Sequence, residues 1–387
     1  MSTKKIYYLD NLKVLLTVLV VLHHTFITYG ASGGWYYKQP TDKLGALIPM
    51  TMFVAINQSF FMGFFFFLSA YFLRPSYERK GEARFVSDRL VRLGIPLVFY
   101  SLILSPFMIY LIYYFAGGHH IGYLSFLGGF DDWIDFGVLW FVVALLLFTL
   151  VYVVVRKVSV GESEVGRKVL VDRRGEGLEV RKGPPSVSGI LLFAVGIGVI
   201  SFLVRLLFPV GWVLKPLGFQ FGHFTQYISL FVLGIVASKN DWLNRLEYRT
   251  GKKLLVAVVL LILFFPVFYV IKVKLDMPLE WYSGGFHWQS LLYAVWEQVI
   301  GFSIIVLLLA WGKEKWNRSS TLLSRLSRSA FAVYIFHPLV VISLSLAVRN
   351  WSIDPAMKLL FVAPLAVIGS FLLGSFLVRL PGVKKII

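Results

Sequence analysis

Four polar residues in the first hydrophobic segment have the spacing of one helix face. Lys13 and His24 are eleven positions apart, so in a helix they lie within about 20° of the same azimuth, about 16 Å apart along the axis. Asp10 and Thr17 fall within roughly 60° of that line. This pattern favours acid–base chemistry by His24. The alternative is that Lys13 reaches the headgroups and His24 only packs. His23, about 100° away, is expected to be structural.

Two arginines form a second candidate site. Arg89 and Arg92 are three residues apart and would share a helix face, with Pro96 marking a helix start or kink just beyond. Paired guanidinium groups can bind phosphate oxygens in bidentate fashion, so the pair is a candidate site for a phosphorylated ligand. Taken alone, the pattern favours the alternative, in which both residues only contribute to the charge of a membrane-flanking loop.

Two further ionisable residues interrupt later hydrophobic segments. His337 is followed by Pro338, and a neutral imidazole there can exchange a proton or bond a backbone carbonyl freed by the proline. Glu297 stands alone among apolar residues. A lone carboxylate inside a membrane is costly, so Glu297 is expected to be protonated or paired with Arg205, Lys13 or a histidine.

The remaining histidines carry no recognisable metal pattern. His119, His120, His223 and His287 are expected in solvated loops, and no metal site is predicted. The chain has no cysteine, which excludes disulfides, thiolate catalysis and cysteine-ligated metals. It also lacks a phosphate-binding loop and an HExxH motif.

The elements that position these residues must be membrane helices. Hydrophobic residues make up 58% of the 387, charged residues only 15%, and mean hydropathy is +0.75; soluble domains are more polar. Runs of about 20 apolar residues recur, enough to cross the hydrocarbon core. The first run has no small-residue cleavage site and is expected to be retained as a helix. We therefore predict an all-α integral membrane protein, a bundle of about ten transmembrane helices.

The basic residues predict how the bundle is oriented. Most of the 38 Lys and Arg residues lie in alternate inter-helix segments and near the two ends of the chain. This bias places both termini in the cytoplasm, so the net charge of +18 reflects topology and no nucleic-acid partner is expected. The predicted spans are 7–28, 48–73, 93–115, 138–155, 188–208, 225–239, 254–273, 288–311, 329–348 and 356–378.

The chain is expected to form one domain, residues 1–387. Its single long polar segment, about 156–187, is rich in charge and Gly and ends in Pro-Pro, which predicts a flexible cytoplasmic loop. No convincing internal repeat is present, although many transporter folds contain one.

Five motifs, in order, resemble those of acyltransferase family 3, a family of membrane proteins. The matching segments are Leu9-Asp10-Asn11-Leu12-Lys13 with His24, FFFFLSAYFL at 64–73, Arg89 with Arg92, Leu139-Trp140-Phe141, and Tyr334 with His337 and Pro338. Lys13 stands where the family usually has arginine. Residues 219–243 resemble a subgroup that includes glucan succinyltransferases. The resemblance covers nearly the whole chain and agrees with ten spans.

The resemblance implies a function and a set of site residues. It implies transfer of an acetyl, succinyl or similar short acyl group from cytoplasmic acyl-CoA to a hydroxyl of an extracytoplasmic glycan or glycolipid, in the inner cell membrane, with no permanently bound cofactor. Arg89 and Arg92 would bind acyl-CoA. The expected catalytic residues are His24 as base, His337 as its helper, and Lys13 oriented by Asp10; the expected supporting residues are Trp140, Glu297 and Tyr334.

Two questions stay open at this point. Transfer can be direct, or it can pass through an acyl-histidine with ping-pong kinetics. A transporter or flippase of a glycan or lipid intermediate shares the many spans and the intramembrane polar residues, although it would favour repeated halves. A non-catalytic membrane scaffold is the third reading, in which the alignment of Lys13 with His24 is accidental.

Overall fold

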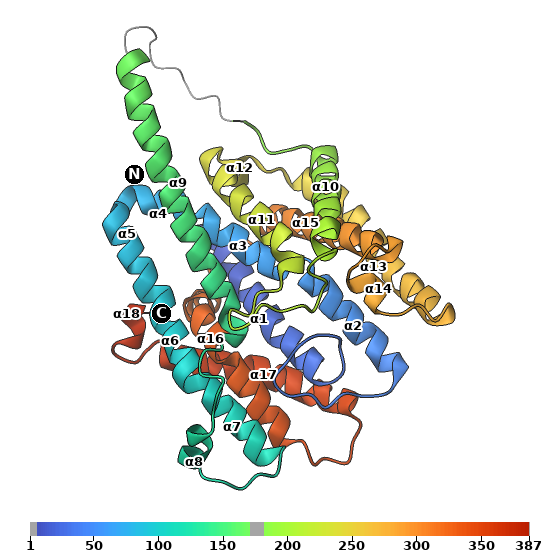
Figure 1. The fold of residues 1–387 in the computed structure, drawn as a ribbon. Helices are drawn as coiled ribbons and strands as arrows, with labels where there is room; N and C mark the ends of the chain where they lie inside the picture. Colours follow the sequence, from blue (N-terminus) through green and yellow to red (C-terminus); the bar gives the residue numbers. More distant parts are fainter. Residues whose placement is uncertain (1–5, 171–181, 387) are drawn as a thin grey trace.

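The computed structural model describes residues 6–170 and 182–386, and these residues fold into a bundle of long helices (Figure 1). Ten helical segments in this part of the chain are long and apolar enough to cross a membrane, which confirms the predicted number of spans. The described residues form no β-strand, only one isolated bridge between Leu214 and Phe219.

Several crossings are built from more than one helix. The first crossing is α1 (Tyr7–Thr28). The second consists of α2 (Leu44–Gln58), α3 (Phe61–Tyr71) and α4 (Leu73–Lys80), and the third of α5 (Glu82–Arg89), α6 (Ile95–Phe99) and α7 (Ser105–Phe115). The fourth is α9 (Trp140–Leu170). The next six are α10 (Val187–Arg205), α11 (Phe221–Lys239), α13 (Tyr248–Lys274), α15 (Trp288–Lys315), α16 (Thr321–Ala347) and α17 (Pro355–Leu377). Short helices are α8 (Tyr123–Gly128), α12 (Trp242–Arg245), α14 (Glu280–Ser283) and α18 (Val383–Ile386).

The helices approach closely where glycine lies at their crossings. α11 packs along α3, and Gly234 lies where an added Cβ would come within 2.5 Å of the Phe67 carbonyl oxygen. α15 meets the junction of α2 and α3 through Gly301, beside the Ser59 carbonyl. Small residues allow such contact in a bilayer, where lipid tails remove most of the hydrophobic drive for association.

α1 is one of the more deeply buried helices of the bundle. It packs against α16 and α17, with further contacts to α2, α3 and α15. Leu12, Leu16 and Val21 of α1 are fully buried, so this helix is covered on several sides. The first and ninth crossings are therefore neighbours, which places His24 and His337 in reach of one another.

The two largest differences from the sequence-based prediction concern the third and fourth crossings. The third crossing begins at Glu82 and not near residue 93, and it continues through π-helical turns at Leu90–Gly94 and Tyr100–Leu104. Arg89 and Arg92 thus belong to this helix, because its polar first turns extend it beyond the apolar run. α9 likewise continues to Leu170, so the predicted flexible segment 156–187 starts as helix. Residues 171–181 of that segment lie outside the described residues.

The even number of crossings puts the two ends of the described chain on the same side. We call this the terminal side, and the opposite side the cavity side. The terminal side carries Ile6, Gly81 and the segments 182–186, 240–247 and 316–320. The cavity side carries the segments 29–43, 116–136, 206–220, 275–287 and 348–354.

Candidate active site

His24 lies one turn before the end of α1 on the cavity side and faces a histidine of α16. Its Nδ1 is 3.0 Å from Nε2 of His337, and the two rings are nearly parallel, with centroids 5.0 Å apart. His337 is fully buried, while His24 is partly exposed and lines a cavity. The two histidines predicted by sequence therefore form a pair, with His24 as the member that meets the cavity.

The tautomers of the pair follow from Pro338. Proline has no N–H, so the carbonyl of Tyr334, four residues earlier, lacks its helical donor. His337 Nδ1 lies 2.8 Å from that carbonyl oxygen, which can only accept, so Nδ1 carries the proton. In the neutral pair, His337 Nε2 then accepts a hydrogen bond from Nδ1–H of His24. Nε2 of His24 keeps a free lone pair, as a general base needs.

Trp35 covers His24 from a loop of the cavity side. The two rings are stacked, with centroids 4.0 Å apart and planes at 17°. Gly30 and Gly33 have φ of +141° and +149°, which lets the chain return over the end of α1. Trp35 was not among the site residues predicted from sequence, because stacking across a loop leaves no periodic signal.

The second part of this loop, at residues 39–41, is hydrogen-bonded to the segment that precedes α17. Gln39 donates to the Arg349 carbonyl at 3.0 Å, and Thr41 donates to Asp354 at 3.0 Å. Burial acts to raise the pKa of Asp354, but the Ala356 amide, Lys43 and Thr41 together hold that pKa below its ordinary value. These contacts fix the loop that carries Trp35.

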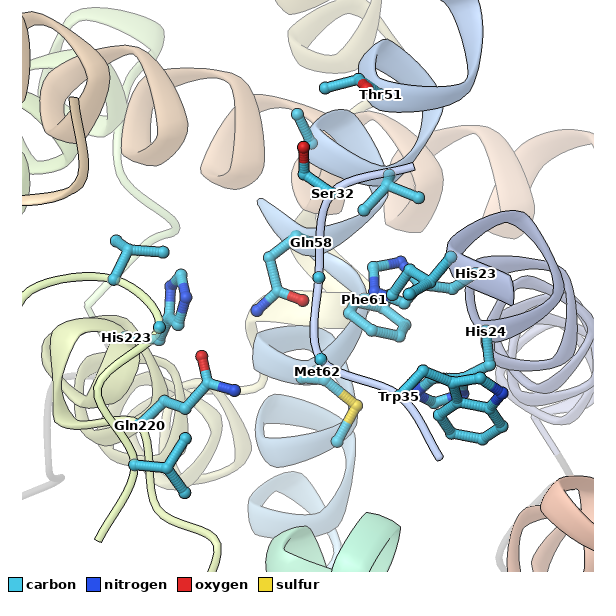
Figure 2. A pocket seen from close by; sticks show the side chains of 18 of the residues that line it. His23, His24, Ser32, Trp35, Thr51, Gln58, Phe61, Met62, Gln220 and His223 are labelled. Carbon is cyan, nitrogen blue, oxygen red and sulfur yellow. The ribbon is translucent and has the colours of Figure 1, made fainter. Parts of the chain in front are cut away.

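A cavity of about 740 Å³ lies beside His24, between helices and loops of the cavity side. Its walls combine aromatic rings, among them Trp35, Trp140 and Tyr227, with polar groups such as Gln58. Figure 2 shows Gln58, Phe61 and Met62 between the wall of His24 and the opposite wall. Its size and mixed lining suit a small organic ligand.

Trp140 and Tyr334, predicted to support the site, both line this cavity. Trp140 stacks on Tyr227, with ring centroids 5.4 Å apart. Tyr334 donates its hydroxyl to the Val138 carbonyl, which joins α16 to the start of α9. Tyr36, another lining residue, shares a 2.7 Å hydrogen bond with Tyr100; burial and the nearby Asp135 raise the pKa of Tyr36 and keep its phenol neutral.

His23 also lines the cavity, and its packing contacts are those of a buried residue; its predicted structural role stays a prediction. It is buried, its Nδ1 lies 3.2 Å from the Asn57 amide nitrogen, and its ring stacks on Phe61 with centroids 4.8 Å apart. These contacts join α1 to the junction of α2 and α3.

Glu297 contacts two partners of the kinds that the sequence suggested, Arg205 and a histidine. It bonds Arg205, and His223 Nδ1 lies 3.1 Å from its Oε1. The expectation that His223 is a solvated loop residue is wrong, because His223 lies in the first turn of α11 and is buried. The sequence named Arg205 as one candidate partner of Glu297, but it did not indicate that His223 of α11 would be the histidine beside it.

Lys13 and Asp10 lie together, but away from His24. Their side chains form an ion pair at 3.3 Å near the terminal side, and Lys13 also lies over the ring of Phe72 at 5.2 Å. Neither lines the cavity. The shared azimuth with His24 is retained, but the axial offset of about 16 Å separates them.

Arg89 and Arg92 lie in the third crossing near the terminal side, and neither lines the cavity. The Arg89 guanidinium lies 5.3 Å from the centre of the Phe85 ring, and Arg92 is exposed. Their predicted role in phosphate binding is not tested by these contacts and stays a prediction.

Together, the bundle with its ten crossings and the pair of His24 and His337 define a multi-pass membrane protein with a candidate acid–base centre. Within residues 6–170 and 182–386, no three His, Asp or Glu side chains are arranged to hold a metal ion. The chain belongs to acyltransferase family 3: residues 6–375 match this family, described as an acyltransferase domain. No curated protein and no solved structure matches the chain. The predicted likeness to glucan succinyltransferases stays a prediction.

Proposed function

We propose that this membrane acyltransferase moves a short acyl group, such as acetyl or succinyl, from cytoplasmic acyl-CoA to a hydroxyl of an extracytoplasmic glycan or glycolipid. The terminal side would then face the cytoplasm, and the bilayer would be the inner cell membrane. The observation that carries the proposal is the contact of His24 Nδ1 with His337, beside a cavity on the side opposite the termini.

In the proposed reaction His24 is the general base. Its Nε2 takes the proton of the acceptor hydroxyl as the oxygen attacks the thioester carbonyl. The new C–O bond forms, the C–S bond breaks, and the imidazolium returns its proton to the departing CoA thiolate. His337 accepts from Nδ1–H of His24 throughout, so it orients the ring and stabilises the positive charge that develops there.

The donor would approach from the terminal side. Arg89 and Arg92 would bind the CoA phosphates, and the pantetheine arm would run inward past the Asp10–Lys13 pair. The thioester must then cover about the 16 Å that separates Lys13 from His24 along α1. The acceptor would enter the cavity from the other side, so that donor and acceptor meet at His24 without sharing an entrance.

The experiment follows free thiol released from acetyl-CoA and succinyl-CoA by protein in membranes that contain cell-envelope material, with acylation of that material as a second readout. His24→Asn keeps polarity and approximate volume, so insertion should survive while transfer falls by about 10²- to 10⁴-fold. His287→Asn is the matched control, because His287 stacks on Trp281 of the same side and does not line the cavity.

Two results would count against the proposal. Retention of more than about a tenth of wild-type transfer by His24→Asn would remove it as the base, given that estimate. Absence of thiol release by the wild-type protein with both donors would favour the transporter reading. Burst kinetics would distinguish an acyl-histidine intermediate from direct transfer.

A further inference from the structure

A second ionic cluster lies against the cavity, on a wall that the proposed reaction does not use. It consists of Arg205 of α10, His223 of α11 and Glu297 of α15. Arg205 is 0% exposed, Glu297 1% and His223 5%. Ionisable groups inside a membrane are costly and commonly mark a functional site, so the placement of all three needs a reason.

Arg205 and Glu297 already neutralise one another. Arg205 bonds the Glu297 carboxylate and donates its Nε–H to the Gly222 carbonyl at 3.1 Å. Gln298 adds a 3.3 Å bond to the same carboxylate oxygen. The charge of Glu297 is therefore balanced without His223. The ion pair of Arg205 and Glu297 would by itself be sufficient to join α10 to α15, so the presence of His223 is not explained by it.

His223 extends this pair to the cavity surface. Its Nδ1 lies 3.1 Å from Glu297 Oε1 and 3.5 Å from Arg205 Nη2, while its ring lines the cavity. The carboxylate favours a proton on Nδ1, as in other carboxylate–histidine pairs. Nε2 is then the nitrogen available to a ligand.

The position of His223 is opposite the proposed base. Figure 2 shows His223 and Gln220 on one wall and His24 with Trp35 on the other, with Gln58 between them. A molecule that presents one hydroxyl to His24 and reaches His223 must therefore cross the cavity.

We propose that His223, held by Glu297, is a second binding group for the acceptor and selects an acceptor that bridges the two walls. This inference rests on the proposed function and names its substrate class: an uncharged, polyhydroxylated molecule of about two sugar rings. One hydroxyl would lie at Nε2 of His24, and another polar group would bond Nε2 of His223. His223 acts on specificity and takes no part in the bond-forming step.

The lining of the cavity favours this chemistry over an anionic or simple alcohol ligand. Trp140 and Tyr227, stacked on one another, offer aromatic surface beside the polar groups. One cation, Lys272, and one anion, Asp135, both line the wall, so these two leave no net charge that would select an ion. A monohydric alcohol would reach His24 alone and gain nothing from His223.

The experiment measures binding without catalysis. Binding of maltose, lactose and chitobiose to detergent-purified protein is followed by thermal shift, with glycerol as the small polyol. His223→Phe keeps the ring volume and leaves the Arg205–Glu297 pair intact, so it should fold. Loss of one hydrogen bond should weaken disaccharide binding roughly 3- to 10-fold. His223→Gln should recover part of this loss, and His287→Phe should bind as the wild type does.

Gln220→Leu, on the same wall, gives an independent variant and should also weaken disaccharide binding by roughly 2- to 5-fold. The inference is overturned if no disaccharide of the panel stabilises the wild-type protein, or if His223→Phe and Gln220→Leu bind as tightly as wild type. Disaccharide binding without any thiol release from acyl-CoA would instead contradict the proposed function and leave the sugar site standing.

Discussion

The hydrogen-bond chain from Tyr334 to His24 makes His337 a test of the proposed mechanism. His337→Phe keeps the ring volume but removes the acceptor of the 3.0 Å bond from His24 Nδ1. His24 then loses the partner that fixes its tautomer and that would stabilise the imidazolium. A charge-assisted hydrogen bond contributes about 1.5–3 kcal/mol, which corresponds to a fall in kcat of roughly 10- to 150-fold.

The assay is single-turnover and steady-state acyl transfer in membranes at matched expression. The KM for acyl-CoA should change little, because His337 is buried behind His24 and does not line the cavity. His337→Gln carries a side-chain oxygen that can accept from His24, so it should be more active than His337→Phe. If His337→Phe keeps more than half of wild-type kcat, or if both variants lose activity equally, the orienting role is refuted.

Three other predictions concern the donor site, the loop over His24 and the topology. Replacing both Arg89 and Arg92 by Gln should weaken acyl-CoA binding by about 2–4 kcal/mol, seen as a rise in KM at unchanged yield; an unchanged KM would leave both residues with a topological role only. The pKa of Asp354 is lowered in the folded protein. The stabilisation that the Asp354 carboxylate gives to loop 29–43 should therefore be complete above the ordinary pKa of a carboxyl. It should be lost as pH falls through the lower pKa of the folded state. The protection of amides in that loop against hydrogen exchange, relative to the intrinsic rate at each pH, should fall accordingly in acid, and should fall at neutral pH in Asp354→Ala; equal protection in wild type and Asp354→Ala would exclude the anchor. A tag near Gly128 should be labelled from outside and a reporter after Ile387 from the cytoplasm, and labelling of both from one side would disprove the orientation.

The sequence was sufficient to predict features that depend on local order. Ten spans follow from the length and polarity of apolar runs, and all ten are present. The proline after His337 also indicated locally that a carbonyl is freed at Tyr334. By contrast, the start of the third crossing was missed, because the polar turns from Glu82 are helical without being apolar.

Features that depend on packing between helices were beyond the sequence. His24 and His337 are 313 residues apart; only the family resemblance implied that His337 assists His24, and no pattern in the residues indicated the contact. The spacing of Lys13 and His24 predicted their axial offset of about 16 Å, and Lys13 accordingly does not line the cavity. His223 was misread because its position after a loop suggested solvent, whereas it is buried and its Nδ1 lies beside Glu297.

The pairing of α1 with α16 also sets an order of assembly. A chain threaded into the bilayer from its N-terminus contains His24 from the first crossing, but its partner enters only with the ninth. The ties from Gln39 and Thr41 to Arg349 and Asp354 form later still, just ahead of the last crossing. A nascent or truncated chain of eight crossings therefore carries the proposed base without its partner, and its acyl-transfer activity should be reduced.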